Sequence, residues 1–138
     1  MKKTDSFVRI VPLEMFRRGV MLLVGKEVDD LKRGFLEVCM GVKWPQGRSC
    51  EEMFDLVASK IKEADTCAGC AFEIDACGDK FIYLKKSDRL TLIHEIVHVV
   101  DMMIRDLGLD NRCPSEDRAY MVEYLFGEFS NEKGGRHD

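Results

Sequence analysis

The sequence lacks any apolar run long enough to cross a membrane. Its most apolar stretch, Val20 to Val24, is far shorter than the roughly 20 residues that a membrane-spanning helix needs. Lys2 and Lys3 are followed by the polar residues 4–6 rather than by the apolar core of a secretory signal. We therefore expect no membrane partner and a cytoplasmic location.

The chain also has no excess of positive charge. With 21 basic and 25 acidic residues its formal net charge is −4, which argues against a surface built for phosphate backbones. Nucleic acid is therefore not an expected partner. A length of 138 residues, 46% hydrophobic and 33% charged, is typical of one ordinary globular domain.

The sequence has neither the second C-x-x-C nor the histidine pair, one of which a zinc-knuckle motif needs beside its first C-x-x-C. The six cysteines are Cys39, Cys50, Cys67, Cys70, Cys77 and Cys113. In a reducing cytosol they are expected to be free thiols rather than a disulfide scaffold. Cys67 and Cys70, with Cys77 seven residues later, leave open a second, thiolate-bound zinc. The reading that we favour is that they are small residues at the entrance of a hairpin.

Histidine is scarce, yet two of the three histidines lie four residues apart and enclose the pattern H-E-x-x-H. On an α-helix, His94 and His98 would lie on one face, one turn apart, and could present two ring nitrogens to one metal ion. Glu95 would flank the ion and could take a proton from a zinc-activated water.

The residues around this motif predict a helix. Ser87 and Asp88 are candidate N-caps, and Leu90 to Leu107 contains no glycine or proline before Gly108. The expected buried stripe consists of Leu90, Ile93, Val97, Val100 and Ile104. His94, His98 and Asp101 would form a neighbouring buried polar row, for which a metal is the simplest partner. The alternative is that solvent or carbonyl groups satisfy both histidines.

The rest of the sequence predicts an α+β fold with a small mixed sheet and about four helices. Strands are expected at residues 7–11, 20–24, 71–75 and 80–85, and helices at residues 28–40, 49–64, 90–107 and 115–129. Ser49 and Glu52 form a candidate capping box at the start of the second helix. Residues 1–129 would make a single domain and residues 130–138 a flexible tail. His137, within that tail, would be solvent-exposed.

The strand Phe81 to Leu84 leads directly into the H-E-x-x-H helix. We expect it to lie along the active-site cleft, because an extended peptide can add to a free strand edge through backbone hydrogen bonds.

Two histidines do not complete a catalytic zinc site, which usually has three protein ligands. The metzincin pattern is excluded, because it requires glycine at position 101 and a ligand at position 104, where the chain has Asp101 and Ile104. A glutamate from the last helix is the remaining common solution. Glu116 and Glu123 are both candidates, and we favour Glu116 because Tyr120, one turn on, could support the site. Glu116 could instead only interact with the helix dipole.

His94-Glu95-Ile96-Val97-His98, followed by Ser115-Glu116-Asp117-Arg118-Ala119-Tyr120, resembles the glutamate-liganded branch of the zincin superfamily. It is similar to small H-E-x-x-H proteins of phages and mobile elements and, more distantly, to the ImmA/IrrE group. The resemblance covers mainly residues 80–129.

This resemblance implies a zinc ion held by His94, His98 and Glu116, with Glu95 as the general base. Since no family-like histidine follows the motif, oxyanion stabilisation would fall to Tyr120 or Tyr124. Asp101 would accept a hydrogen bond from a ligand histidine, unless it is simply a solvated carboxylate.

These features predict a cytoplasmic zinc metallopeptidase that acts on a protein or peptide. The alternative is a zinc-stabilised binding or regulatory protein of zincin fold without hydrolytic activity, and a third, weaker reading is a metal-free protein with a helical core. The presence of Glu95 favours the enzyme, because a purely structural zinc site needs no base.

Overall fold

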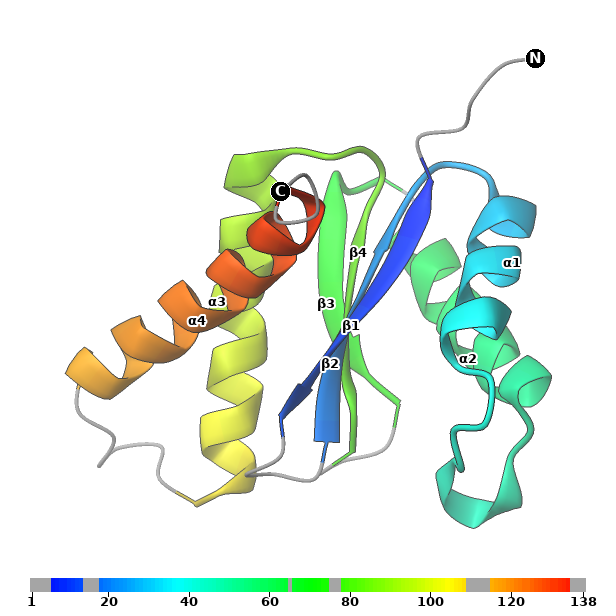
Figure 1. Cartoon of the computed structure of the whole chain (residues 1–138), viewed down its shortest axis with the longest axis horizontal. Helices are drawn as coiled ribbons and strands as arrows, with labels where there is room; N and C mark the ends of the chain where they lie inside the picture. Colours follow the sequence, from blue (N-terminus) through cyan, green and yellow to red (C-terminus); the bar gives the residue numbers. More distant parts are fainter. Residues whose placement is uncertain (1–5, 14–17, 65, 75–77, 109–114, 135–138) are drawn as a thin grey trace.

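The computed structural model describes residues 6–13, 18–64, 66–74, 78–108 and 115–134 (Figure 1). The strands are β1 (Phe7–Leu13), β2 (Arg18–Val24), β3 (Gly69–Glu73) and β4 (Lys80–Leu84). The helices are α1 (Val28–Val38), α2 (Cys50–Glu63), α3 (Arg89–Asp106) and α4 (Ser115–Gly134), with a short 3-10 turn, η2 (Pro45–Gly47). The predicted α+β class, with a mixed sheet and four helices, is confirmed.

The four strands form one sheet in the order β1-β2-β4-β3. β1 pairs antiparallel with β2, β2 pairs parallel with β4, and β3 pairs antiparallel with β4. The predicted hairpin of the third and fourth strands is therefore confirmed, although residues 75–77 of its turn lie outside the described residues. The free edge predicted for Phe81 to Leu84 is wrong, because β4 lies between two strands and β3 is the edge on that side.

Helices cover both faces of the sheet, α1 and α2 on one and α3 and α4 on the other (Figure 1). This explains why the apolar run of β2 is continuous, since a strand that is buried on both faces needs no polar residues. Met21 and Leu23 belong to the core beneath α1 and α2. Val20, Leu22 and Val24 belong to the core beneath α3 and α4.

The predicted capping box starts α2. The Glu52 backbone N–H donates to Ser49 Oγ at 3.0 Å, and the Ser49 backbone N–H donates to Glu52 Oε1 at 2.8 Å. These two bonds satisfy donors that would otherwise lack partners in the first turn of the helix. Two residues close together in the sequence therefore determine where α2 begins.

The buried side of α3 differs from the predicted stripe. Of the predicted residues, Val100 and Ile104 are buried, whereas Leu90 and Val97 are exposed. The helix also buries Leu92, Ile96 and Val99 against the sheet. The predicted buried row of His94, His98 and Asp101 is also wrong, because all three residues are exposed. α3 has apolar residues on both sides of this row, so periodicity alone allowed more than one buried face. Packing on the sheet selected a face that shares Val100 and Ile104 with the predicted stripe.

Helix α4 covers the sheet with only part of its surface. Leu125 and Phe129 are buried, whereas Tyr120 is exposed. The helix continues to Gly134, so residues 130–134 of the predicted tail are helical, and residues 135–138 lie outside the described residues. None of the helices in the described ranges is long and apolar enough to span a membrane.

Candidate metal centre

Helix α3 brings the two histidines of the H-E-x-x-H motif together at its exposed surface. Asp88 caps the helix by accepting a hydrogen bond from the Thr91 backbone N–H at 3.2 Å, and it also contacts the Thr91 hydroxyl. His94 and His98 follow on the same side, with ring centroids 4.8 Å apart and an interplanar angle of 79°. Their Nε2 atoms lie 3.3 Å from each other.

That separation fits a shared metal ion. Two nitrogens bound to one zinc at about 2.05 Å, with a tetrahedral angle between them, lie roughly 3.3 Å apart. The rings therefore need little rearrangement to act as a pair of ligands. The alternative, a direct hydrogen bond between one protonated and one unprotonated Nε2, has a similar distance and would leave both rings in solvent.

Glu95 lines the cleft beside the histidines and is buried, with 6% of its surface exposed. Its carboxylate and the two ring nitrogens all lie within 4.8 Å of one another. No described residue forms a hydrogen bond or an ion pair with the Glu95 side chain. The carboxylate oxygens keep some contact with solvent, because no fully buried side-chain oxygen or nitrogen of the described residues lacks a hydrogen-bond partner. A cation in the adjacent space would stabilise the Glu95 charge.

That space is a cleft of about 610 Å³ between α3 and the edge strand β3. Its lining residues are Gly69, Cys70 and Ala71 from β3 and Glu95, His98, Asp101, Met102 and Arg105 from α3. Because Gly69 and Ala71 have small side chains or none, the β3 wall of the cleft consists largely of backbone. A Cβ atom added at Gly69 would lie 2.7 Å from the Tyr83 carbonyl oxygen, so a larger residue does not fit there without movement.

The backbone of β3 is available along this cleft. The Lys85 N–H donates to the Ala68 carbonyl at 3.0 Å, which continues the β3 and β4 register and identifies that pair as hydrogen-bonded. Because hydrogen-bonded and non-bonded pairs alternate in an antiparallel ladder, Gly69, Ala71 and Glu73 direct their N–H and C=O groups away from β4. The edge that can receive an extended chain is therefore on β3.

The two glutamates predicted as third ligands lie apart from the histidines. Glu116 and Glu123 are exposed, and neither belongs to the cluster that His94, Glu95 and His98 form within the described residues. Arg118 of α4 faces α3, since its Nη1 donates to Asp101 Oδ1 at 2.7 Å. With about 100° of turn per residue, Glu116 and Glu123 lie roughly 160° and 140° round α4 from Arg118. They face solvent, so the orientation of α4 explains their separation from the site.

The surroundings of Asp101, Tyr120 and Tyr124 also differ from those predicted. Asp101 pairs with Arg118 rather than with a histidine nitrogen, so the solvated-carboxylate alternative is closer to what is observed. Tyr120 and Tyr124 have 63% and 50% of their surfaces exposed. In this arrangement neither tyrosine borders the cleft.

The C-x-x-C pair forms no metal-binding cluster among the described residues, and Cys77 lies outside them. Cys70 packs with the core beneath α1 and α2, so its side chain is on the opposite face of β3 from Glu95. Burial, the Glu95 charge and Cys67 together raise the Cys70 pKa to about 11. Cys70 therefore contributes backbone, rather than a ligand atom, to the cleft.

An ion-pair network at the far end of the cleft was not found by sequence reasoning. Lys80 Nζ, which is buried, lies 2.7 Å from Glu73 Oε1 and 2.5 Å from Asp106 Oδ2. Arg105 Nη2 lies 2.6 Å from Glu73 Oε2 and 3.1 Å from Asp106 Oδ1. The one available signal was a lysine at the start of a strand that is otherwise apolar.

The network changes the acidity of both carboxyl groups. Burial opposes ionisation of Glu73, but hydrogen bonds from Lys80 and Arg105 outweigh it and lower the Glu73 pKa. The same balance lowers the Asp106 pKa. The charged network thereby joins β3, β4 and the last turn of α3, the elements that flank this end of the cleft.

Comparisons with known proteins found no matching family model, no matching curated protein and no matching solved structure.

Proposed function

We propose that this chain is a zinc-dependent hydrolase, specifically a metallopeptidase. The observation that carries the proposal is the convergence of two histidine Nε2 atoms, 3.3 Å apart, beside a buried carboxylate that has no described protein partner. This donor set suits zinc, which prefers neutral imidazole ligands. The cleft beside it is open along a strand edge, so a substrate can approach the same atoms.

The residues take separate roles in this proposal. His94 and His98 hold the ion through Nε2, and Glu95 acts as the general base from the cleft side. When bound, zinc would lower the pKa of a water and polarise a scissile carbonyl. Glu95 would accept the proton of the attacking water and deliver it to the leaving amine, a role aided by its shielded position at the cleft wall.

The substrate class follows from the shape of the cleft. An extended peptide can pair with the outward N–H and C=O groups of Gly69 and Ala71, which places its backbone opposite Glu95 and His98. Small side chains on this face of β3 leave room for the substrate main chain. A protein or peptide substrate is therefore better suited than a compact small molecule.

Glu116 stays a prediction as the third ligand. To reach the histidines, α4 would have to turn about its axis or shift, which would break the Arg118–Asp101 pair. That pair is exposed and contributes less than about 1 kcal/mol, so the larger barrier is the burial of Leu125 and Phe129, which such a movement of α4 would disturb. Glu116→Gln and Glu123→Gln, compared in zinc affinity, would separate the two candidates and the option that neither binds.

The test is a matched comparison of wild type and Glu95→Gln. Metal content is measured on protein never exposed to chelator, and hydrolysis is measured on a fluorescence-quenched random peptide library. We expect about one zinc per chain in both proteins, and a loss of at least 100-fold in hydrolysis for the variant, as is typical when a general base is removed. Equal hydrolysis by both proteins would contradict the role of Glu95.

A second function, zinc-stabilised binding without hydrolysis, has one observation in its favour. The described residues supply two histidines and one carboxylate but no separate third ligand and no oxyanion donor from Tyr120 or Tyr124. This reading predicts one bound zinc and a higher unfolding temperature with zinc, but no cleavage of any peptide in the library. It also predicts that Glu95→Gln weakens zinc binding, because the carboxylate would then be a ligand.

A further inference from the structure

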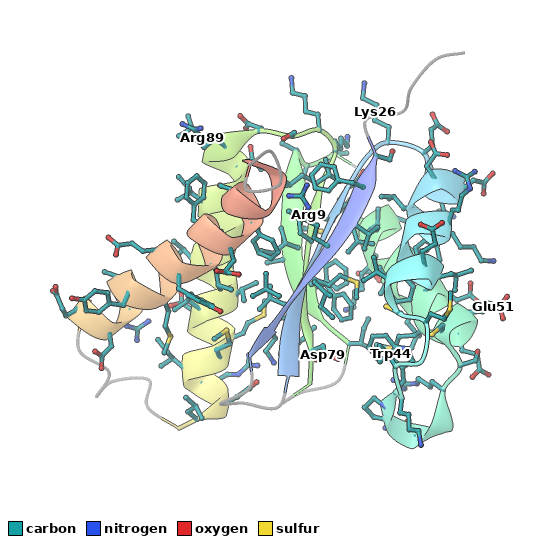
Figure 2. All side chains as sticks on the ribbon, in the orientation of Figure 1. Arg9, Lys26, Trp44, Glu51, Asp79 and Arg89 are labelled. Atoms are coloured by element: carbon teal, nitrogen blue, oxygen red, sulfur yellow. The ribbon has the colours of Figure 1, made fainter. Side chains whose placement is uncertain are left out.

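A second cluster of reactive groups lies between α1 and α2, on the opposite face of the sheet from His94. Cys39 follows the last turn of α1, and Cys50 is the first residue of α2. The Cys50 thiol donates a hydrogen bond to the Cys39 carbonyl at 3.2 Å. The indole N–H of Trp44, from the connecting loop, donates to Cys50 Sγ at 3.4 Å. The Cys50 sulfur thus contacts both the Cys39 backbone and Trp44, the single tryptophan of the sequence, which lies on the α1 and α2 side of the sheet (Figure 2).

The two thiols differ in access. Cys39 is completely buried, whereas Cys50 is only partly buried, and both are free. Burial, followed by the neighbouring Cys50 and Asp79, raises the Cys39 pKa to about 12. A soluble oxidant can therefore react at Cys50 but not directly at Cys39, because buried thiols in apolar surroundings are inert toward external reagents.

We propose that Cys50 and Cys39 form a dithiol site that a small disulfide oxidant of the glutathione class converts into a disulfide joining α1 to α2. The Cys50 thiolate attacks one sulfur of the oxidant, forms a mixed disulfide and releases one thiolate. The Cys39 sulfur, after losing its proton, then attacks the Cys50 sulfur and releases the second thiolate. Two protein thiols are oxidised, and one small disulfide is reduced to two thiols.

Contact between the two residues is what makes the second step feasible. Cys39 reacts only within the molecule, where the Cys50 sulfur lies 3.2 Å from the Cys39 carbonyl oxygen, and attack within one molecule offsets the high proton affinity of the Cys39 thiol. The bond would tie the end of α1 to the start of α2 at the position where Trp44 stacks on Phe35, with ring centroids 5.9 Å apart. Trp44 therefore reports on the state of the pair, since its N–H contacts the reacting sulfur.

The experiment incubates full-length protein with glutathione disulfide, blocks the remaining thiols and digests the protein with trypsin without reduction. Trypsin cleaves after Lys43 and Arg48, so Cys39 and Cys50 fall in different peptides, residues 34–43 and 49–60. We expect these two peptides to be linked, with a mass about 2 Da below their sum because two hydrogens are lost. Trp44 fluorescence should change as the link forms and return after dithiothreitol is added.

Two outcomes would overturn the proposal. One is a stable glutathione adduct on Cys50 with Cys39 still free, which would show that the second step fails. The other is oxidation confined to Cys67 and Cys70, which is distinguishable because both lie in the single peptide of residues 63–80.

Matched variants separate the two steps. Cys39→Ser should stop at the glutathione adduct, with a mass gain of about 305 Da on residues 49–60. Cys50→Ser should leave Cys39 unmodified, because the oxidant has no accessible thiol in this cluster. Cys67→Ser, which alters an exposed cysteine outside it, should form the Cys39–Cys50 link as wild type does. Tryptic mapping of the disulfide in the wild-type protein tests the proposal even if Cys39→Ser folds poorly.

Discussion

Replacement of Lys80 by methionine tests whether the buried ion-pair network holds the cleft together. Only 3% of the Lys80 side chain is exposed, and it contacts Glu73 on the neighbouring strand and Asp106 at the end of α3. Methionine has a similar length and volume, so Lys80→Met removes the charge with little change in packing. In the variant, the Glu73 and Asp106 carboxylates lose the ammonium group that both of them contact.

The expected loss of stability depends on how deeply Glu73 and Asp106 are buried and on the ion-pair partner that they retain. Removing one member of a buried ion pair typically costs 3–5 kcal/mol, because the other charge loses its compensation. Glu73 and Asp106 retain Arg105 and have 21% and 17% of their side chains exposed, which reduces the penalty. We therefore expect Lys80→Met to lower the free energy of unfolding by about 3 kcal/mol at neutral pH, the lower end of that range.

Urea unfolding followed by circular dichroism measures this difference. With a urea m-value of about 1.5 kcal/mol per molar, a loss of about 3 kcal/mol moves the midpoint down by about 2 M. Lys43→Met, which alters an exposed lysine of a loop, is the control and should move it by less than about 0.5 M. A midpoint for Lys80→Met within that control range would refute the reasoning.

The difference in unfolding free energy between wild type and Lys80→Met should also depend on pH. The folded-state pKa values of Glu73 and Asp106 are lowered from their ordinary values of 4.5 and 3.8. Their contribution to stability is therefore complete above the ordinary values and is lost as the pH falls through the lower, folded-state values. The difference between wild type and Lys80→Met should shrink below about pH 4.5, when the carboxylates of the variant become protonated first. A constant difference from pH 7 to pH 3 would contradict the assignment.

Three further predictions concern the site and the helices. His98→Ala should weaken zinc binding by more than about 100-fold in a calorimetric titration, because removing a metal ligand costs more affinity than removing a residue that only supports one. His137→Ala, the control, should leave the zinc affinity unchanged. Ser49→Ala removes half of the capping box and should cost about 1 kcal/mol in urea unfolding, whereas Ser59→Ala, within α2, should not. Arg118→Gln should cost less than about 1 kcal/mol, and it should raise zinc affinity only if Glu116 swings in as the third ligand.

Local chemistry determined much of what the sequence predicted correctly. The capping box at Ser49 and Glu52 depends on residues three positions apart, so tertiary contacts were not needed to place the start of α2. The continuous apolar run from Val20 to Val24 predicted a strand, and this run forms most of β2, all of it buried. His94 and His98 meet because one helical turn separates them, whichever face of α3 is buried.

The three-dimensional packing decided the rest, because those features depend on residues far apart in the chain. Apolar side chains on both sides of the α3 histidine row allowed two buried faces, and contact with the sheet selected the one with Leu92 and Ile96. Pairing of β4 with β2 buried the strand that was expected to be free and left β3 at the edge. Burial of Leu125 and Phe129 against the core orients α4 with Glu116 outward, and the Arg118–Asp101 contact is consistent with that rotation.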